Sequence, residues 1–111
     1  MVRYGLHAMP LHLSFLSQPI RDLCERRAAA EYALGRQAAR HLRARLSDIC
    51  AAEKISDVVA GRPKTMQTQV VISLFPPHKM VLEPAMTELP TKNDGATDWD
   101  AIDHFRVIEV N

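Results

Sequence analysis

Hydrophobic and polar positions near the start of the chain follow two different periods. Residues 11–16 (LHLSFL) alternate Leu and Phe with His and Ser, and this period of two predicts a half-buried strand. Residues 20–27 carry a short apolar stripe and predict a helix, with Ser17 as its N-cap and Pro19 in its first turn. The chain is therefore expected to open with a strand followed by a helix.

A longer helical segment is predicted over residues 28–49. It has no Pro and one Gly, and it is rich in Ala, Leu, Arg and Gln, which favour helix. Arg36, Arg40 and Arg43 fall on one side of this helix, and Gly35 is a mild interruption and a candidate break between two helices. The opposite, apolar face is formed by Ala30, Leu34, Ala38, Leu42, Leu46 and Ile49.

Strand patterns begin after Gly61-Arg62-Pro63. This tripeptide is predicted to end the helical part, because Gly tolerates positive φ and Pro disfavours helix at the preceding residue. Residues 64–74 alternate and then become continuously apolar, which predicts one strand. Residues 75–78 (FPPH) predict a turn, and residues 79–82 begin an antiparallel partner. Pro84 either ends that partner or places it at a sheet edge.

The last third of the chain predicts a long loop and a final strand. Residues 83–97 contain two prolines and Asn-Asp-Gly without periodicity, which indicates a loop. Residues 97–100 (TDWD) predict the cap of a short helix or turn, and residues 105–110 (FRVIEV) predict a strand. The resulting order is β-α-α-β-β-β, an α+β fold with two N-terminal helices packed on a sheet. Candidate core contacts in this region are Trp99, Ile102 and Phe105.

Composition is typical of a single globular domain. The chain has 111 residues, of which 47% are hydrophobic and 24% charged, enough for one modest core. Residues 1–8 are expected to be an N-terminal extension and residues 9–111 one domain. Cys24 and Cys50 form no CxxC motif and are expected to be reduced thiols at apolar helix positions. No signal peptide or membrane-length apolar run is present, so a soluble, cytoplasmic protein is predicted.

Charge is unevenly distributed although the net charge is only +1. Residues 21–64 contain ten Lys or Arg and six acids, whereas residues 83–103 contain six acids and one Lys. Such a split often separates a face for a polyanion from a face for something else. Solvated helix faces together with an acidic loop also account for it.

Motifs for metal, nucleotide and covalent chemistry are absent from the sequence. The five histidines show no HExxH or H-x3-5-H spacing, and there is no GxGxxG, GxxxxGK[ST] or GxSxG. The acids of residues 94–103 lack the D-x-D-x-D-G register of a calcium loop. No metal and no cofactor is therefore expected.

Basic and imidazole groups near strand ends remain as candidates for chemistry. RNA cleavage without a metal needs a base for the 2′-hydroxyl, cations for the developing phosphorane charge and an acid for the leaving 5′-oxygen. Structural explanations stay open: Lys64 and Arg106 suit edge strands, His78 suits a turn, and the helix arginines suit a solvated face. The candidates are Arg62, Lys64, His78, Lys79, His104 and Arg106.

Three segments together resemble one protein family: LSFLSQPIRDLCE, LRARLSDICAAEKISDVVAGRPK and DWDAIDHFRVIEV. In this order, over residues 9–111, they are similar to the RelE/HigB-like toxins of bacterial type II toxin–antitoxin systems. The nearest subgroup is sometimes labelled killer suppression protein. The resemblance implies a RelE-like fold, with helices packed on a small twisted, mainly antiparallel sheet. It also implies a metal-independent mRNA endoribonuclease that acts at the ribosome.

The same resemblance implies partners and, together with the basic and imidazole groups named above, gives the predicted site residues. The expected partners are a helix-turn-helix antitoxin, mRNA on the ribosome and, only through the antitoxin, operator DNA; no membrane is expected. His78-Lys79 stands where the family has an aromatic-Arg pair, and Lys64 follows the GRP motif as a basic residue does in the family. The predicted catalytic residues are Lys79, Arg106, His78 and His104. The predicted RNA-binding residues are Arg62, Lys64, Arg36, Arg40 and Arg43.

An alternative function follows from where the chain departs from the family. Many HigB-like toxins carry functional Asp, Tyr or His residues near the C-terminus, whereas this sequence has Glu109-Val110-Asn111 there. The alternative is a non-catalytic toxin-fold binding module, either within an antitoxin–operator complex or as a ParE-like gyrase inhibitor. An antitoxin role fits poorly, because the sequence shows no tight helix-turn-helix and predicts many strands.

Overall fold

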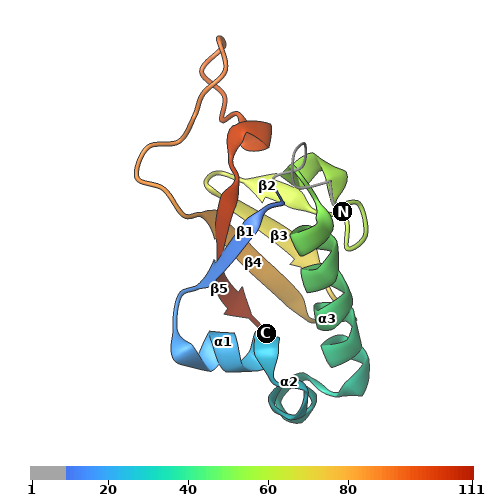
Figure 1. The fold of residues 1–111 in the computed structure, drawn as a ribbon. Helices are drawn as coiled ribbons and strands as arrows, with labels where there is room; N and C mark the ends of the chain where they lie inside the picture. The colour runs from blue at the N-terminus through green and yellow to red at the C-terminus, as the bar shows by residue number, and fades with distance from the viewer. Residues whose placement is uncertain (1–9) are drawn as a thin grey trace, which may run out of the picture.

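Three helices and a five-stranded mixed sheet form the part of the chain that the computed structural model describes, residues 10–111 (Figure 1). The predicted α+β class is confirmed, and the predicted extension at residues 1–8 lies outside the described residues. The helices are α1 (Gln18–Glu25), α2 (Arg27–Leu34) and α3 (Arg36–Ala51), with 3-10 turns η2 (Ile55–Asp57) and η3 (Trp99–Ala101). The strands are β1 (His12–Phe15), β2 (Lys64–Met66), β3 (Gln69–Ser73), β4 (Lys79–Pro84) and β5 (His104–Val110).

The helical region breaks in two places. Ser17 caps α1 as predicted, because its side chain accepts from the Ile20 amide at 3.4 Å. Arg26 is extended and separates α1 from α2. Gly35 separates α2 from α3 with φ 87° and ψ 163°, a conformation that essentially only Gly adopts. The prediction of two helices is therefore wrong, since the candidate break at Gly35 is a real one.

The strand predicted over residues 64–74 is also wrong, because the chain reverses inside it. Gln67 takes a positive φ of 55°, and Met66 pairs with Gln69 across a two-residue turn. Gln and Thr are acceptable in strands, so the alternation of the sequence did not reveal this turn. The observed order is β-α-α-α-β-β-β-β instead of β-α-α-β-β-β.

The sheet has the strand order β1-β5-β4-β3-β2. β1 pairs with β5 in parallel, and the other three pairs are antiparallel. β4 lies inside the sheet, so Pro84 ends a central strand and the edge alternative is wrong. The register of β4 against β5 shifts between Val81 and Leu82, which leaves Ile108 as an extra residue in β5.

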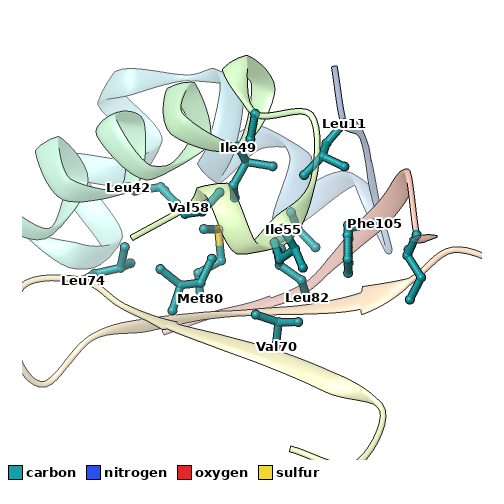
Figure 2. Packing of buried hydrophobic residues seen from close by; sticks show 14 of the residues in the cluster. Leu11, Leu42, Ile49, Ile55, Val58, Val70, Leu74, Met80, Leu82 and Phe105 are labelled. Carbon is teal, nitrogen blue, oxygen red and sulfur yellow. The ribbon is translucent and has the colours of Figure 1, made fainter. Parts of the chain in front are cut away.

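The core lies between the helices and one face of the sheet. Alternate residues of the strands point into it, and the helices lie on this side of the sheet (Figure 2). The opposite face is here called the outer face. Trp99 stacks on Phe105 with ring centroids 6.4 Å apart, and both Phe105 and Ile102 are buried, as predicted. Figure 2 shows this packing for Leu42, Ile49, Ile55, Val58, Val70, Met80, Leu82 and Phe105.

The segment after β4 has more structure than the predicted loop. β4 extends to Pro84, and Thr91 pairs with Thr97 around a tight turn at residues 92–96. Figure 1 shows that this segment projects from the end of the sheet opposite α1 and α2. No helix of residues 10–111 is long and apolar enough to cross a membrane.

Gly61 joins the helical layer to the sheet at a point of very close approach. Its φ is +84°, and its carbonyl accepts from the Ser73 amide at 2.8 Å. A Cβ at this position would lie 2.5 Å from Ile72 Cγ2 and 2.9 Å from the Ser73 carbonyl oxygen. The predicted Gly turn is confirmed, and packing as well as φ requires Gly here.

We predict that Gly61→Ala lowers the free energy of unfolding by about 1–3 kcal/mol more than Gly35→Ala does. Both substitutions strain a positive φ, but a Cβ at Gly35 meets nothing within 4 Å. Urea unfolding of the two variants, followed by circular dichroism, measures the difference. Equal losses would contradict the close approach at Gly61.

The two cysteines differ in accessibility. Both are free thiols; Cys24 is half-buried in α1, whereas Cys50 is exposed, contrary to the predicted apolar position. Desolvation by burial, with a further contribution from the Glu25 carboxylate, raises the pKa of the Cys24 thiol to about 12.

We predict that a thiol reagent labels Cys50 first in the native protein. In a Cys50→Ser variant, the labelling rate of Cys24 should rise about tenfold per pH unit between pH 7 and 10, because the reactive thiolate increases by that factor below the pKa. Mass spectrometry of timed iodoacetamide reactions gives both rates. Labelling of Cys24 as fast as Cys50 at pH 7 would contradict its burial.

Candidate active site

A compact group of polar side chains lies on the outer face across β4, β5 and β1. Leu13, Phe15, Phe105 and Val107 pack into the core, so the residues that alternate with them point outward. Backbone register then places Glu83 opposite Arg106, and Arg106 opposite Ser14. We call Glu83, Arg106, His104, Ser14 and His12 the outer-face cluster.

Direct contacts hold the outer-face cluster together. Arg106 Nε lies 3.3 Å from Glu83 Oε2, and the two side chains are 37% and 34% exposed. His104 Nε2 and Ser14 Oγ lie 3.0 Å apart, so they share a hydrogen bond. The His12 ring meets the His104 ring edge-on, with centroids 6.1 Å apart. The cluster thus combines a carboxylate, a guanidinium, imidazoles and a hydroxyl.

The Arg106 guanidinium is only partly satisfied. Its Nε is shielded from solvent and has no hydrogen-bond partner among the described residues, although the Glu83 carboxylate is close enough for an ion pair. A buried donor normally finds an acceptor. The ion pair with Glu83 uses this shielded Nε, and a guanidinium has five N–H donors in all, so Arg106 retains donors for an additional anionic acceptor.

A hollow of about 290 Å³ opens beside this ion pair. Glu83 and Arg106 form its charged part, and the turn between β2 and β3 and the segment after β4 complete it. A cavity of this size with a few convergent polar groups suits part of a nucleotide better than a whole drug-sized ligand. The lining residues are Thr68, Glu83, Pro84, Met86, Thr87, Leu89 and Arg106.

The four predicted catalytic residues fall into two separate pairs. His104 and Arg106 both belong to the outer-face cluster. Lys79 begins β4, four residues before Glu83 and thus about 13 Å from it along the strand. His78 is a turn residue, since its backbone bonds to Phe75 and Leu74. The structure does not bring His78 and Lys79 together with Arg106.

The predicted RNA-binding residues also separate. Lys64 is exposed on the edge strand β2, where it pairs with Val71, and Arg62 is exposed with a φ of 47°. Arg36, Arg40 and Arg43 lie on α3, in the helical layer instead of on the outer face. Lys64 lies two strands away from β4, because its partner Val71 pairs in turn with Val81, so none of the five belongs to the outer-face cluster.

Sequence reasoning missed Glu83, Ser14 and His12. Glu83 was assigned to the acidic loop because Pro84 was expected to stop the strand earlier. Its period-two spacing from Lys79 was the available signal, since residues 79, 81 and 83 share one face. Ser14 and His12 alternate with core residues in the predicted first strand, but nothing in the sequence showed that β1 lies beside β5.

Metal ligation and similarity to known proteins add no further assignment. No three His, Cys, Asp or Glu side chains of residues 10–111 are grouped as a metal site. Comparison with protein families, with curated proteins and with solved structures finds no match. The resemblance to RelE/HigB-like toxins therefore stays a prediction.

We predict that Glu83 and Arg106 are energetically coupled. A double-mutant cycle with Glu83→Gln and Arg106→Met should give a coupling of about 0.5–1 kcal/mol, because both groups are about two-thirds removed from solvent. The Arg27–Glu31 pair has the same 3.3 Å separation and a similarly buried carboxylate, but Arg27 is 70% exposed, so its coupling should be no more than about 0.5 kcal/mol. Urea unfolding measures both cycles. A coupling at Glu83–Arg106 no larger than at Arg27–Glu31 would contradict the role of burial.

Proposed function

We propose that this chain is the toxin of a type II toxin–antitoxin module and acts as a metal-independent mRNA endoribonuclease. The observation that carries the proposal is the outer-face cluster, in which Glu83, Arg106 and His104 lie on one open sheet face beside a hollow. A RelE-like arrangement is part of the same proposal. Its support is the mainly antiparallel sheet with helices packed on one face only.

The outer-face cluster has the groups that RNA cleavage without a metal needs. Glu83 is placed to accept the proton of the ribose 2′-hydroxyl, whose oxygen then attacks the adjacent phosphorus. Arg106 is placed to bind the equatorial phosphate oxygens as negative charge develops on them. His104, held by Ser14, is placed to protonate the 5′-oxygen as its bond to phosphorus breaks. The products are a 2′,3′-cyclic phosphate and a free 5′-hydroxyl.

The three groups lie close enough together to act on one phosphate. Glu83 is the cross-strand neighbour of Arg106, and His104 lies two residues away from Arg106 on β5. The Cα atoms of Glu83 and His104 are thus about 8 Å apart, one across the strand from Arg106 and the other along it. This spacing brings base, acid and guanidinium within reach of one bound nucleotide.

The expected partners follow from the proposed module. mRNA on the ribosome is the substrate, and a helix-turn-helix antitoxin is the inhibitor, through which operator DNA is reached. The open outer face supports this, because an antitoxin segment that covers the Glu83–Arg106 hollow would block access for RNA.

A non-catalytic binding module is the second candidate. The Glu83 carboxylate neutralises Arg106 in the free protein, and such a pair equally suits a structural role. In that case the chain acts within an antitoxin–operator complex or as a ParE-like inhibitor, and messages stay intact.

We predict that induction of the wild-type chain arrests growth and produces new codon-positioned 5′ ends on translated messages. Primer extension after induction detects these ends, and absence of new ends would favour the binding module. His104→Gln should reduce cleavage about 100-fold or more, the usual size of a general acid's contribution.

The matched control is His78→Gln, which removes the same side chain from the β3–β4 turn and should keep cleavage within about threefold of wild type. Both variants need a circular dichroism spectrum like that of the wild type. Normal cleavage by His104→Gln together with loss in His78→Gln would place the active site at the other end of β4.

A further inference from the structure

A second basic site lies between α2 and α3, in the helical layer. The arginines at positions 36, 40 and 43 recur at i, i+4 and i+7, so they share one side of α3. The core side of α3 is a different one, formed by Ala38, Ala39, Leu42 and Ile49. The arginines border a polar hollow of about 350 Å³, lined by Arg27, Glu31, Arg36, Gln37, Arg40 and Arg43.

Positive charge in this hollow is largely uncompensated. Arg27 pairs with Glu31, with Arg27 Nε 3.3 Å from Glu31 Oε2. No carboxylate of residues 10–111 forms an ion pair with the other three arginines. The lining of this hollow thus has four arginines and one carboxylate, Glu31, which is already paired with Arg27.

Arg43 is held more deeply than Arg36 and Arg40. Its side chain is partly buried, and its Nη1 is shielded from solvent without a hydrogen-bond acceptor among the described residues. Buried donors in folded proteins are nearly always paired. No protein group therefore neutralises this guanidinium through Nη1, which adds to the excess of positive charge beside the hollow.

We propose that the α2–α3 hollow binds a phosphate group of an RNA backbone. A phosphate presents oxygens in several directions, so several arginines can reach it at once, and Arg donates to it in a bidentate fashion. The alternative anion is a carboxylate of an acidic peptide. Protein partners bind chiefly through buried apolar anchors, and the six lining residues include none. RNA interfaces are instead polar and strongly basic.

This site is separate from the outer-face cluster. The helices cover the core face of the sheet, and the α2–α3 corner is at the end of the molecule opposite the segment after β4 (Figure 1). An RNA phosphate bound here therefore does not belong to the bond that the outer face is proposed to cut. The α2–α3 hollow binds structured RNA in addition to any message bound at the outer face. This binding does not depend on whether the outer face cleaves RNA.

The test is the affinity of the full chain for a fluorescently labelled RNA hairpin, measured by anisotropy without ribosomes. Arg36→Gln/Arg40→Gln should weaken binding at least tenfold at 150 mM salt, because both side chains are exposed and their loss leaves the core intact. The slope of log affinity against log salt should fall by about two. Arg21→Gln/Lys92→Gln removes the same charge from exposed sites elsewhere and should change the affinity less than about twofold.

Three results would overturn the inference. Equal loss in both double variants would indicate general electrostatic attraction without a site. Unchanged hairpin binding by Arg36→Gln/Arg40→Gln, with inorganic phosphate still raising the wild-type melting temperature, would indicate a site for free phosphate. Displacement of the hairpin by a poly-glutamate peptide at equal charge would assign the hollow to carboxylates.

Primer extension with the wild type and hairpin anisotropy with the Arg36→Gln/Arg40→Gln variant separate this inference from the proposed function. Absence of message cleavage by the wild type, together with at least tenfold weaker hairpin binding by Arg36→Gln/Arg40→Gln, leaves the phosphate site standing. The hairpin affinity of Arg36→Gln/Arg40→Gln therefore tests the phosphate site whatever the outcome of primer extension.

Discussion

The burial of one sheet face under the helices is the constraint on which the rest of the structure depends. Leu42 and Ile49 of α3 are fully buried against strand residues such as Ile72 and Leu82. Each such side chain contributes about 1.5–3 kcal/mol when it leaves water. Strand side chains alternate between the two faces of the sheet. The packing that buries the core face therefore places Glu83, Arg106 and Ser14 on the outer face. The candidate active site is thus a consequence of which face the helices cover.

Close contact between the layers depends on Gly61. The chain leaves the helical layer there and immediately runs beside Ile72 and Ser73, at a distance that admits no Cβ. From Gly61 the chain continues through Lys64 into the edge strand, and the β2–β3 turn leads back toward Glu83, with Thr68 lining the same hollow. A residue larger than Gly at position 61 would therefore displace the backbone just before this strand.

The basic and acidic segments of the sequence do not form two separate faces in the folded structure. The acidic part of the chain does not form one face, because Glu83 pairs with Arg106 and Asp100 accepts from the Ser56 amide at 3.4 Å. The basic part divides between the α2–α3 hollow and the outer face. The two proposed phosphate sites differ accordingly. At the outer face a carboxylate accompanies the arginine, which suits acid–base chemistry, whereas the α2–α3 hollow has arginines in excess, which suits binding alone.

The sequence by itself determined the features that depend on neighbouring residues. Helical periodicity, the Ser17 cap, the Gly61 turn and the buried Ile102 and Phe105 were all predictable, because propensity, capping and alternation act over a few positions. The class of fold followed from the same patterns. The turn at Gln67 was missed since Gln and Thr give no turn signal, and the break at Gly35 was left open because one Gly in a helix is tolerated.

Contacts between distant residues could be identified only from the fold. His104 and Arg106 were named from the sequence, but their partners Ser14 and Glu83 come from β1 and β4, and strand order is not encoded in local alternation. Lys79 was predicted beside Arg106 and lies about 13 Å from Glu83 instead, because the direction and register of β4 fix it at the far end. Sheet topology depends on the sum of all pairings, so the chemistry of the outer face became visible only with the fold.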